Sequence, residues 1–453
     1  MSGSDPRTGG REWIYAADVK GRFQRYHRMI ALVLYTVLFA TPWIQIGGHP
    51  ALQLDLAARR MFFFGAVYTP RDSIFLVLHL LGAAFTLFFL TSLFGRLWCG
   101  FACPQTVFLE ELIRPIERFW EGSRGKRMAA DKKPLKGVVL ARKAAKVASF
   151  ALVAFVLSMA IITYFTGPIP LWTGQAGAGA YIAVAAFAGT LFFDFVWFRE
   201  QFCNYLCPYA RFQGALTDEH SFVIEYNLEL GEPRMRGKKA RAATPNVGAC
   251  IDCNKCVAVC PQGIDIRNGY QLECINCARC VDACTGVMNK LEQPSLIKYT
   301  TATEREGGKQ KWLRPRTVAY MALLSTIATI LIVLTNGRMG IEATVNRLPG
   351  SLYQVDDDGW TRNTFMLNVT NNDVDTTLAV NISIDGLPGA ELVVPPISVE
   401  PTAAVNLPLV VRVPPDADID RTMPFDVQVV GDNGETMTVS TTFKSGTDVP
   451  LEG

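Results

Sequence analysis

Residues Ala249–Met288 read ACIDCNKCVAVCPQGIDIRNGYQLECINCARCVDACTGVM and hold eight of the twelve cysteines of the chain. The stretch contains one spacing twice: three cysteines each separated by two residues, and a fourth after three more residues. Pro261 follows the fourth cysteine of the first copy. Bacterial ferredoxins that carry two iron–sulfur clusters have this spacing. The stretch therefore predicts a ferredoxin domain with a pair of [4Fe–4S] clusters.

The spacing also predicts which cysteines share a cluster. Three closely spaced thiolates in a tight loop reach three corners of one cubane, whereas the fourth cysteine of each run reaches the other cluster. We assign one cluster to Cys250, Cys253, Cys256 and Cys284, and the other to Cys274, Cys277, Cys280 and Cys260. Zinc is the weaker interpretation, because two C-x2-C pairs already complete a zinc site. Disulfides are disfavoured in the cytoplasm, where the charge distribution below places this domain.

The composition of the rest of the chain is that of a membrane protein. Apolar residues make up 49% of the 453 residues and charged residues only 19%. Five stretches are long and apolar enough to span a bilayer: 29–46, 74–94, 147–165, 181–199 and 317–335. We expect a polar tail (1–28), a four-helix membrane domain (29–199), a region with the ferredoxin domain at about 245–295 (200–316), and a fifth span. No obvious cleavage site follows the first stretch, which favours a retained anchor over a removed signal peptide.

Lysine and arginine are distributed unevenly among the connecting segments. The tail has six, segment 95–146 has twelve and segment 200–316 has sixteen, whereas segment 47–73 has three and segment 166–180 has none. Because cytoplasmic loops carry the excess of basic residues, the tail and the ferredoxin domain are predicted to be cytoplasmic. Five spans then place the C-terminus outside. On such a protein the basic runs suit anionic lipid better than nucleic acid.

The C-terminal region, 340–453, has the pattern of an all-β domain. Four of its segments alternate or are rich in β-branched residues, namely Thr364–Val369, Leu378–Ile384, Ala404–Val411 and Phe425–Val430. Asp432, Asn433 and Gly434 suggest a hairpin turn. From 336 onward there are six Lys and Arg against seventeen Asp and Glu, and no cysteine. We expect an exported immunoglobulin-like β-sandwich that contacts other proteins.

The other four cysteines form two C-x3-C-P motifs. Cys99 and Cys103 stand in LWCGFACPQTVF after the second predicted span, and Cys203 and Cys207 stand in QFCNYLCPYARF after the fourth. The matching aromatic residues and prolines indicate an internal repeat of two spans and one motif, with the two motifs at the same depth. Cys103 and Cys207 are expected in the bend before a helix that begins at the proline.

Four thiolates brought together at the membrane face suit a soft metal such as Cu(I), or a further cluster. The alternative is that they are buried apolar thiols that only pack. Three nearby arginines either hold thiolate charge or extend to lipid headgroups, namely Arg96, Arg199 and Arg211. His79, within the second span, is better explained as a satisfied core histidine than as a ligand.

Several motifs together resemble one family. GRLWCGFACPQTVF, REQFCNYLCPYARFQ, the loop PWIQIGGHPALQLD and the ferredoxin cassette are similar to the cytochrome c oxidase accessory proteins CcoG, FixG and RdxA. The resemblance covers almost the whole chain. It implies a bacterial inner-membrane protein with two [4Fe–4S] clusters and a periplasmic immunoglobulin-like domain.

The resemblance also implies an activity. Members of this family are expected to reduce Cu(II) to Cu(I) for assembly of a cbb3-type oxidase, with Cys99, Cys103, Cys203 and Cys207 as the copper-handling thiols. Partners would be copper, an unidentified electron donor and, through the periplasmic domain, oxidase subunits or assembly factors. Two other functions remain open: a quinol-linked electron-transfer subunit without special copper affinity, and an assembly scaffold whose clusters only sense redox state.

Overall fold

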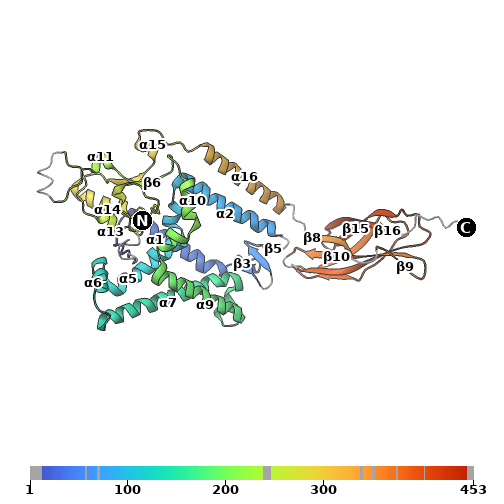
Figure 1. Cartoon of the computed structure of the whole chain (residues 1–453). Coiled ribbons are helices and arrows are strands. Elements are labelled where there is room, and N and C mark those ends of the chain that lie inside the picture. The colour runs from blue at the N-terminus through green and yellow to red at the C-terminus, as the bar shows by residue number, and fades with distance from the viewer. Residues whose placement is uncertain are drawn as a thin grey trace. The chain divides into compact units, whose positions relative to one another are not determined.

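The structure is a computed structural model that describes residues 13–56, 59–68, 72–237, 246–336, 340–348, 352–373, 376–401 and 403–445. The chain divides into two compact units. The first comprises Met1–Ala66 and Pro70–Thr329 and is mainly helical; the second comprises Val67–Thr69 and Ile330–Gly453 and is mainly β-sheet. Figure 1 shows the elements of each unit.

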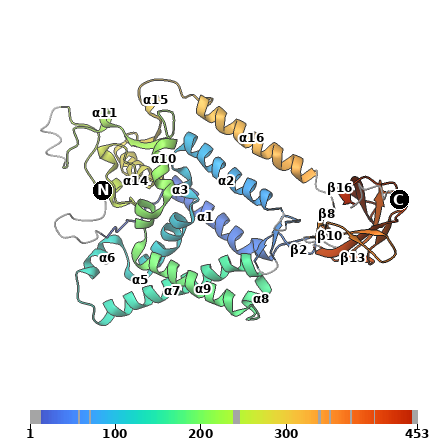
Figure 2. The same cartoon turned by 45° about the vertical axis from the view of Figure 1, so that its right-hand side comes forward.

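Four helices are long and apolar enough to cross a membrane among the residues described. They are α2 (Ser73–Phe94), α7 (Gly137–Thr166), α9 (Ala178–Phe193) with the π-helical turn η4 (Asp194–Phe198), and α16 (Pro315–Asn336). They correspond to four of the five predicted spans. Helices α7 and α9 lie side by side in two views (Figures 1 and 2) and are joined through the short helix α8 (Pro168–Trp172). Phe150 and Leu157 of α7 pack there with Phe195 of η4.

The first predicted span differs from the observed helix. Helix α1 covers Arg22–Ala40, so only residues 29–40 of the predicted stretch 29–46 are helical. Its first turns are polar, and the helix is absent from the four membrane-crossing candidates among the described residues. Pro42 lies in the 3-10 turn η1 (Thr41–Trp43) that follows, consistent with the helix ending before it. Short strands come next: β1 (Gln45–Ile46), β2 (His49–Pro50), β3 (Leu52–Asp55), β4 (Arg60–Phe63) and β5 (Ala66–Tyr68).

Both C-x3-C-P motifs end a span in a bend and start a new helix at the proline, as predicted. In the first copy, α3 (Leu97–Phe101) leads to α4 (Pro104–Val107); in the second, the π-helical turn η5 (Phe202–Leu206) leads to α10 (Pro208–Leu216). Cys103 and Cys207 are the extended residues before these prolines. After α4 the chain continues through η3 (Phe108–Ile113), α5 (Arg114–Glu121) and α6 (Arg124–Asp131).

The ferredoxin region is closed by a two-stranded antiparallel sheet. Strand β6 (Val223–Tyr226) pairs with β7 (Ile297–Thr300), so that Val223 faces Thr300 across the sheet. Between them lie α11 (Leu228–Gly231), α13 (Lys255–Ala258), η6 (Ile266–Asn268), α14 (Arg279–Met288) and η7 (Asn289–Leu291); α15 (Ala302–Arg305) follows β7. Asn254 and Ala278 have matching left-handed conformations before α13 and α14. The two halves of the cassette therefore begin their helices in the same way.

The second unit is a β-sandwich. One sheet has the order β12-β14-β10-β8 with β9 beside β10, and the other has the order β13-β11-β15-β16. The bounds are β8 (Ile341–Arg347), β9 (Gln354–Val355), β10 (Thr361–Asn371), β11 (Leu378–Asp385), β12 (Glu391–Val393), β13 (Ile397–Val399), β14 (Ala404–Val413), β15 (Thr422–Gly431) and β16 (Thr436–Lys444). Phe365, Val411, Phe425 and Phe443 are buried in its core. All four predicted strand segments are confirmed, and the predicted hairpin lies between β15 and β16.

Candidate iron–sulfur and thiol sites

The ferredoxin region contains two cavities, each lined by a set of four cysteines, with Cys256 of the first set also lining the second cavity. Cys250, Cys253 and Cys256 line the first together with Cys284 of α14. Cys274, Cys277 and Cys280 line the second together with Cys260. In both cavities the fourth cysteine comes from the other half of the cassette. These are the two sets that the spacing predicts for the two clusters.

The residues present fit a cluster better than a single metal ion. All eight of these cysteines are free thiols. No three His, Cys, Asp or Glu side chains in the described ranges are close enough to hold one ion. In a cubane each cysteine binds a separate iron atom. The four cysteine sulfurs around a cluster therefore lie farther apart than the ligands of a site that holds one metal ion. The rest of each lining is largely apolar, which suits a shielded cluster.

Burial governs the thiols of these cavities. It raises the pKa of Cys274 and of Cys277 to about 12, so both thiols are protonated near neutral pH before they bind iron. Cluster binding must therefore displace protons, as it does for any thiolate ligand. Cys256 lines both cavities, so the two sites share a wall.

The structure also brings the four C-x3-C-P cysteines near one another. Burial raises the pKa of Cys99 to about 12, and the neighbouring Cys103 and Cys207 add to the rise. Burial raises the pKa of Cys203 too, and the other three cysteines of the motifs contribute. All four are free and partly buried. They lie within electrostatic reach of one another, but no three of them form a ready-made site for one ion in the part of the chain that is described.

Arg96 is within electrostatic reach of both these thiols and the second ferredoxin cavity. Its side chain is only 5% exposed, so it does not extend to lipid headgroups. Burial raises the pKa of Cys99, Cys203 and Cys274, and the positive charge of Arg96 opposes part of that rise. It donates to the carbonyl oxygen of Ala210 over 2.6 Å, and its Nε has no hydrogen-bond partner among the described residues. A buried guanidinium placed in this way favours negative charge on the thiol sites.

Gln105 connects the two halves of the thiol site. It follows Pro104 of the first motif, and its Nε2 donates to both carboxylate oxygens of Asp194 at 3.0 and 2.9 Å. The same nitrogen donates to the carbonyl oxygen of Arg199, which precedes the second motif, over 3.0 Å. This hydrogen bonding fixes the first motif against the approach to the second.

The first C-x3-C-P motif touches the second ferredoxin cavity. A methyl group added to Gly100 would fall 2.6 Å from the carbonyl oxygen of Ile275 and 3.0 Å from the Cα of Cys277. Gly100 is the residue after Cys99, and Cys277 is one of the four cysteines of the second cavity. The backbone approach is possible because glycine has no side chain. The two thiol sites are therefore adjacent through main-chain contact.

The sequence interpretation missed His27. Its Nε2 lies 2.7 Å from the carbonyl oxygen of Cys277, and its ring stacks on Phe101 with centroids 4.1 Å apart. Phe101 stands inside the first motif, so His27 contacts both sites. Nothing in the local sequence marks this residue, because its partner is 250 positions away. His79, which was considered, is satisfied instead by the Phe75 carbonyl of its own helix.

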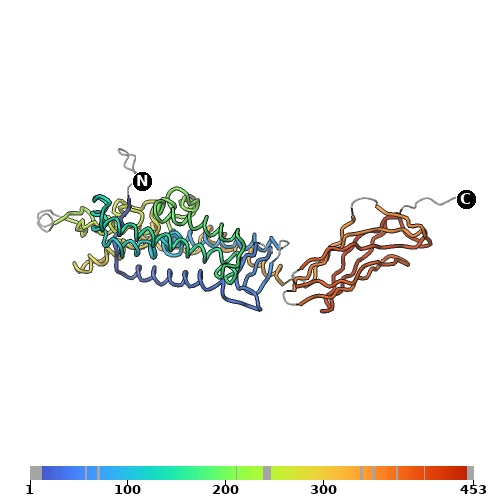
Figure 3. The backbone as a smooth tube through the Cα atoms, turned by 90° about the horizontal axis from the view of Figure 1, so that it is seen from below, coloured from blue at the N-terminus to red at the C-terminus, as the bar shows by residue number. Residues whose placement is uncertain are grey.

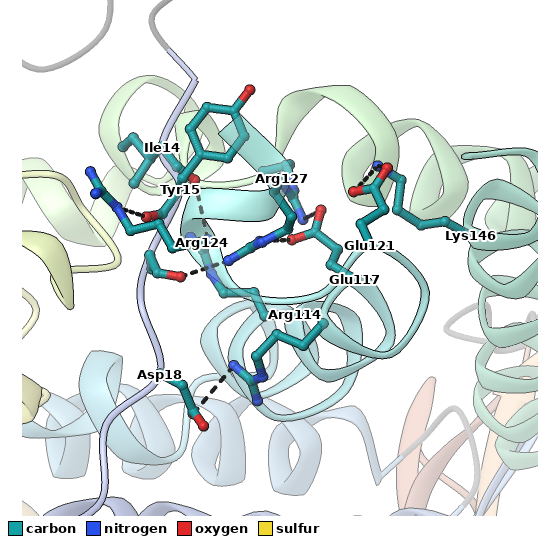
Figure 4. Close-up of polar contacts among 12 residues, drawn as sticks. Ile14, Tyr15, Asp18, Arg114, Glu117, Glu121, Arg124, Arg127 and Lys146 are labelled. Carbon is teal, nitrogen blue, oxygen red and sulfur yellow. Dashed lines mark hydrogen bonds and ion pairs between the residues drawn. The ribbon is translucent and has the colours of Figure 1, made fainter. Parts of the chain in front are cut away.

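A buried network of ion pairs supports the same region and was also missed. Glu117 of α5 pairs with Arg199 at 2.7 Å and with Arg127 at 2.8 Å. Figure 4 shows the carboxylate of Glu117 facing Arg127, with the pair of Glu121 and Lys146 nearby. The side chain of Arg199 is thus engaged in an ion pair away from lipid, whereas that of Arg211 lies outside the described side chains. The network fixes the helices that follow the first motif against the start of the second.

Arg279 extends this network to the ferredoxin. It stands between Cys277 and Cys280, and it pairs with Glu110 at 3.0 Å and with Glu111 at 2.8 Å. Glu110 also pairs with Arg114 of α5. Burial alone would raise the pKa of Glu110, but Arg114 and Arg279 hold it below its usual range. The cluster-binding loop is therefore attached to the membrane unit by buried charges.

Known protein families match the ferredoxin region, the region of the first C-x3-C-P motif and the β-sandwich. Residues 198–302 match a "4Fe-4S dicluster domain", residues 76–121 a "4Fe-4S binding domain", and residues 331–446 an "IG-like fold at C-terminal of FixG, putative oxidoreductase". The chain is 35% identical to the nitrogen fixation protein FixG of Rhizobium meliloti over 427 residues, which covers 84% of this chain and 81% of that protein.

Two proteins of Cereibacter sphaeroides are similar to this chain to about the same degree. Protein RdxB is 35% identical, with 87% of this chain and 89% of that protein covered. Protein RdxA is 32% identical, with 89% of this chain and 90% of that protein covered. The similarity extends over nearly the full length in each case.

Proposed function

Because the chain belongs to the FixG and RdxA family of membrane-associated 4Fe–4S electron-transfer proteins, we propose that it is a cupric reductase. Cys250, Cys253, Cys256 and Cys284 hold one [4Fe–4S] cluster, and Cys260, Cys274, Cys277 and Cys280 hold the other. Copper is the substrate and binds at the thiols Cys99, Cys103, Cys203 and Cys207. When bound, the clusters supply one-electron transfer.

The contact between Gly100 and the loop of Cys277 carries this proposal. It places the copper-binding motif directly against the residues of the second cluster, with main-chain atoms between them. His27 and Phe101 add a second contact between the same two sites. The proposed electron carrier and the proposed substrate site are therefore adjacent, and the ion pairs of Arg279 and Glu117 connect the elements that carry them.

The chemistry of the thiol site favours the reduced metal. Thiolates are soft ligands and stabilise Cu(I). Arg96 offsets the negative charge that the site acquires when thiolates bind the metal. Because burial raises the pKa of these thiols, copper must displace their protons on binding.

We propose that the ferredoxin region faces the cytoplasm and that the β-sandwich faces the periplasm. The unequal distribution of Lys and Arg along the sequence supports this orientation. The acidic amino-acid composition of the β-sandwich region suits contact with an oxidase subunit or assembly factor there. The reduced copper would then serve assembly of a cbb3-type oxidase.

The test uses the full-length protein with its clusters reduced by dithionite and excess reductant removed. Anaerobic addition of Cu(II) and a Cu(I) chelator should reoxidise the clusters and yield one Cu(I) per electron released. Reduction should fall sharply in a variant with all four motif cysteines changed to Ala, while its iron content stays at that of the ferredoxin clusters. Unchanged copper reduction in that variant contradicts the assigned site.

One observation favours a second occupant of the motif thiols. The match to a 4Fe-4S binding domain covers residues 76–121, whose two cysteines are Cys99 and Cys103. A further cluster would be held there, and the protein would be an electron-transfer subunit. Iron analysis distinguishes copper from a third cluster at the motif thiols, because two [4Fe–4S] clusters give about eight iron atoms per chain and three give about twelve.

A further inference from the structure

An apolar groove beside the second cluster cavity has no part in the function proposed above. It lies within the helical unit and encloses about 310 Å³. Its lining comes mainly from Phe23, Tyr26 and Met29 of α1, Leu97 and Phe101 of α3, and Tyr299 of β7. Sites for small organic ligands span about 300–1,000 Å³ and are lined mostly by such side chains. The groove is therefore large enough for the ring of a small organic molecule.

Two aromatic residues connect the groove to the loop that holds the second cluster. The hydroxyl of Tyr299 donates to the carbonyl oxygen of Asn276, between Cys274 and Cys277. Phe101 stacks on His27, whose Nε2 contacts the carbonyl oxygen of Cys277. A molecule in the groove would be separated from this loop by a single layer of side chains. Such a short separation is what electron transfer to the cluster requires.

The groove continues along α1 as an exposed apolar stripe. Met29, Val33 and Val37 follow one another at helical spacing on the face of Tyr26, and they are 61%, 60% and 53% exposed. Figure 3 shows α1, in blue, along the edge of the helical unit. A face of this kind suits the hydrocarbon part of a bilayer. It would accommodate a long apolar tail attached to a ring in the groove.

The lining also limits which polar or aromatic headgroup a lipid-like molecule bound in the groove can have. Among the described residues no charged side chain lines the groove; the guanidinium of Arg22, which lies over the ring of Phe23 at 5.1 Å from its centroid, is not part of the lining. A phosphate would lose its water there without gaining a cation, which is unfavourable. A neutral aromatic ring gains contact with Phe101 and Tyr299 at no such cost. The groove therefore discriminates against phospholipid headgroups and in favour of an uncharged ring.

We propose that this groove binds an isoprenoid quinol and that the quinol is the electron donor of the ferredoxin clusters. The ring lies against Phe101 and Tyr299, and the isoprenoid tail follows the stripe on α1. Oxidation of one quinol to the quinone breaks two O–H bonds, releases two protons to water at the mouth of the groove and gives up two electrons. The two [4Fe–4S] clusters can take up both electrons, because each cluster accepts one. The inference rests on the proposed clusters but not on copper as the final acceptor.

Binding is tested first, without turnover. Decylubiquinone is titrated into the detergent-solubilised, cluster-loaded full chain by calorimetry. Met29→Trp, which fills the groove, should weaken binding by at least about tenfold. Leu32→Trp is the matched control, because Leu32 is exposed about one turn along α1 from Met29 but does not line the groove. Equal affinity in both variants, or no binding to the wild type, overturns the proposal. So does a tightly bound phospholipid that decylubiquinone does not displace.

Electron transfer is tested second. Decylubiquinol should bleach the cluster absorbance of the wild type and of Leu32→Trp, and do so at least about tenfold more slowly in Met29→Trp. Dithionite needs no groove and should reduce the clusters of all three proteins, which shows that the variant is folded and loaded. Reduction by dithionite but not by decylubiquinol in the wild type overturns the quinol proposal alone. Failure of reduced clusters to produce Cu(I) overturns the cupric reductase alone.

Discussion

The imidazole Nε2 of His27 lies 2.7 Å from the carbonyl oxygen of Cys277, a residue 250 positions later in the chain. His27 belongs to α1, and Cys277 belongs to the loop of the second cluster cavity. The ring of His27 is also parallel to that of Phe101, with an angle of 8° between them. One side chain thus joins the first helix, the first C-x3-C-P motif and the ferredoxin.

His27→Phe should loosen the loop of the second cluster. Phenylalanine keeps the stack on Phe101 but leaves the buried carbonyl of Cys277 without this partner, a loss of about 1–3 kcal/mol. We expect faster loss of one cluster during thermal unfolding, measured as iron release, and an altered electron paramagnetic resonance signal of the reduced protein. His79→Phe is the control, because His79 bonds to its own helix. Identical iron release in the two variants would show that the contact with Cys277 has no stabilising role.

Gly100→Ala should separate the first motif from the ferredoxin. Its methyl group would meet the carbonyl oxygen of Ile275 at 2.6 Å, a distance at which backbone atoms must move. Overpacking of this kind costs about 1–3 kcal/mol. Dithionite should still reduce the clusters, but transfer from them to Cu(II) should slow. Gly189→Ala in α9 meets nothing within 4 Å and should be neutral or slightly stabilising. Rapid copper reduction by Gly100→Ala would exclude this contact as the transfer route.

The cysteine spacing and the hydrophobic pattern predicted much of this arrangement because both are local signals. Spacing within 40 residues determines which cysteines can line one cavity, and period-two alternation determines which strands form a sandwich. The helix start at each C-x3-C-P proline is likewise a local effect, because the ring restricts the preceding residue.

The residue at which α1 begins is not determined by the local sequence alone. Asp282 of the ferredoxin accepts hydrogen bonds from the backbone N–H groups of Phe23 at 3.2 Å and Gln24 at 2.8 Å. These contacts satisfy the first amide groups of the helix, so that α1 begins in a polar segment ahead of the apolar run. Two buried ion pairs also join distant parts of the sequence, Glu110 with Arg279 and Glu117 with Arg199. The sequence left open whether Arg199 holds thiolate charge or extends to lipid headgroups and did not single out Arg279, because burial by a remote element leaves no local pattern.

Glu117→Gln should destabilise the helical unit. Arg127 and Arg199 would each lose a charged partner while remaining buried, and breaking a buried pair costs about 3–5 kcal/mol. The melting temperature of the detergent-solubilised protein at pH 7 measures the effect. Glu229→Gln is the control, because Glu229 is exposed and lies outside the network. Equal melting temperatures for both variants would contradict a structural role of the network.

The same network predicts that the stability of the folded protein falls at acid pH. Burial alone would raise the pKa of Glu117, but Arg199, Arg114 and Arg127 hold it below its usual range. A carboxyl whose pKa is lowered by folding stabilises the folded state above its unfolded pKa of about 4.3, and this stabilisation is lost as pH falls through the folded value. The wild type should therefore lose stability below about pH 4 more steeply than Glu117→Gln. Parallel melting curves against pH for both proteins would rule out this contribution.

Arg96→Met should weaken copper binding at the motif thiols. The buried guanidinium supplies positive charge to Cys99 and Cys203, and methionine of similar length removes it. We expect the affinity for Cu(I), measured by competition with a chelator, to fall by about tenfold or more, because an opposite charge nearby favours thiolates. Arg96 also donates to the carbonyl oxygen of Ala210, so the charge and the hydrogen bond must be separated. Arg96→Lys retains the charge and should recover most of the affinity, whereas Arg25→Met, an exposed residue, should change nothing. Equally weak binding by the Met and Lys variants would assign the role of Arg96 to its hydrogen bond rather than to its charge.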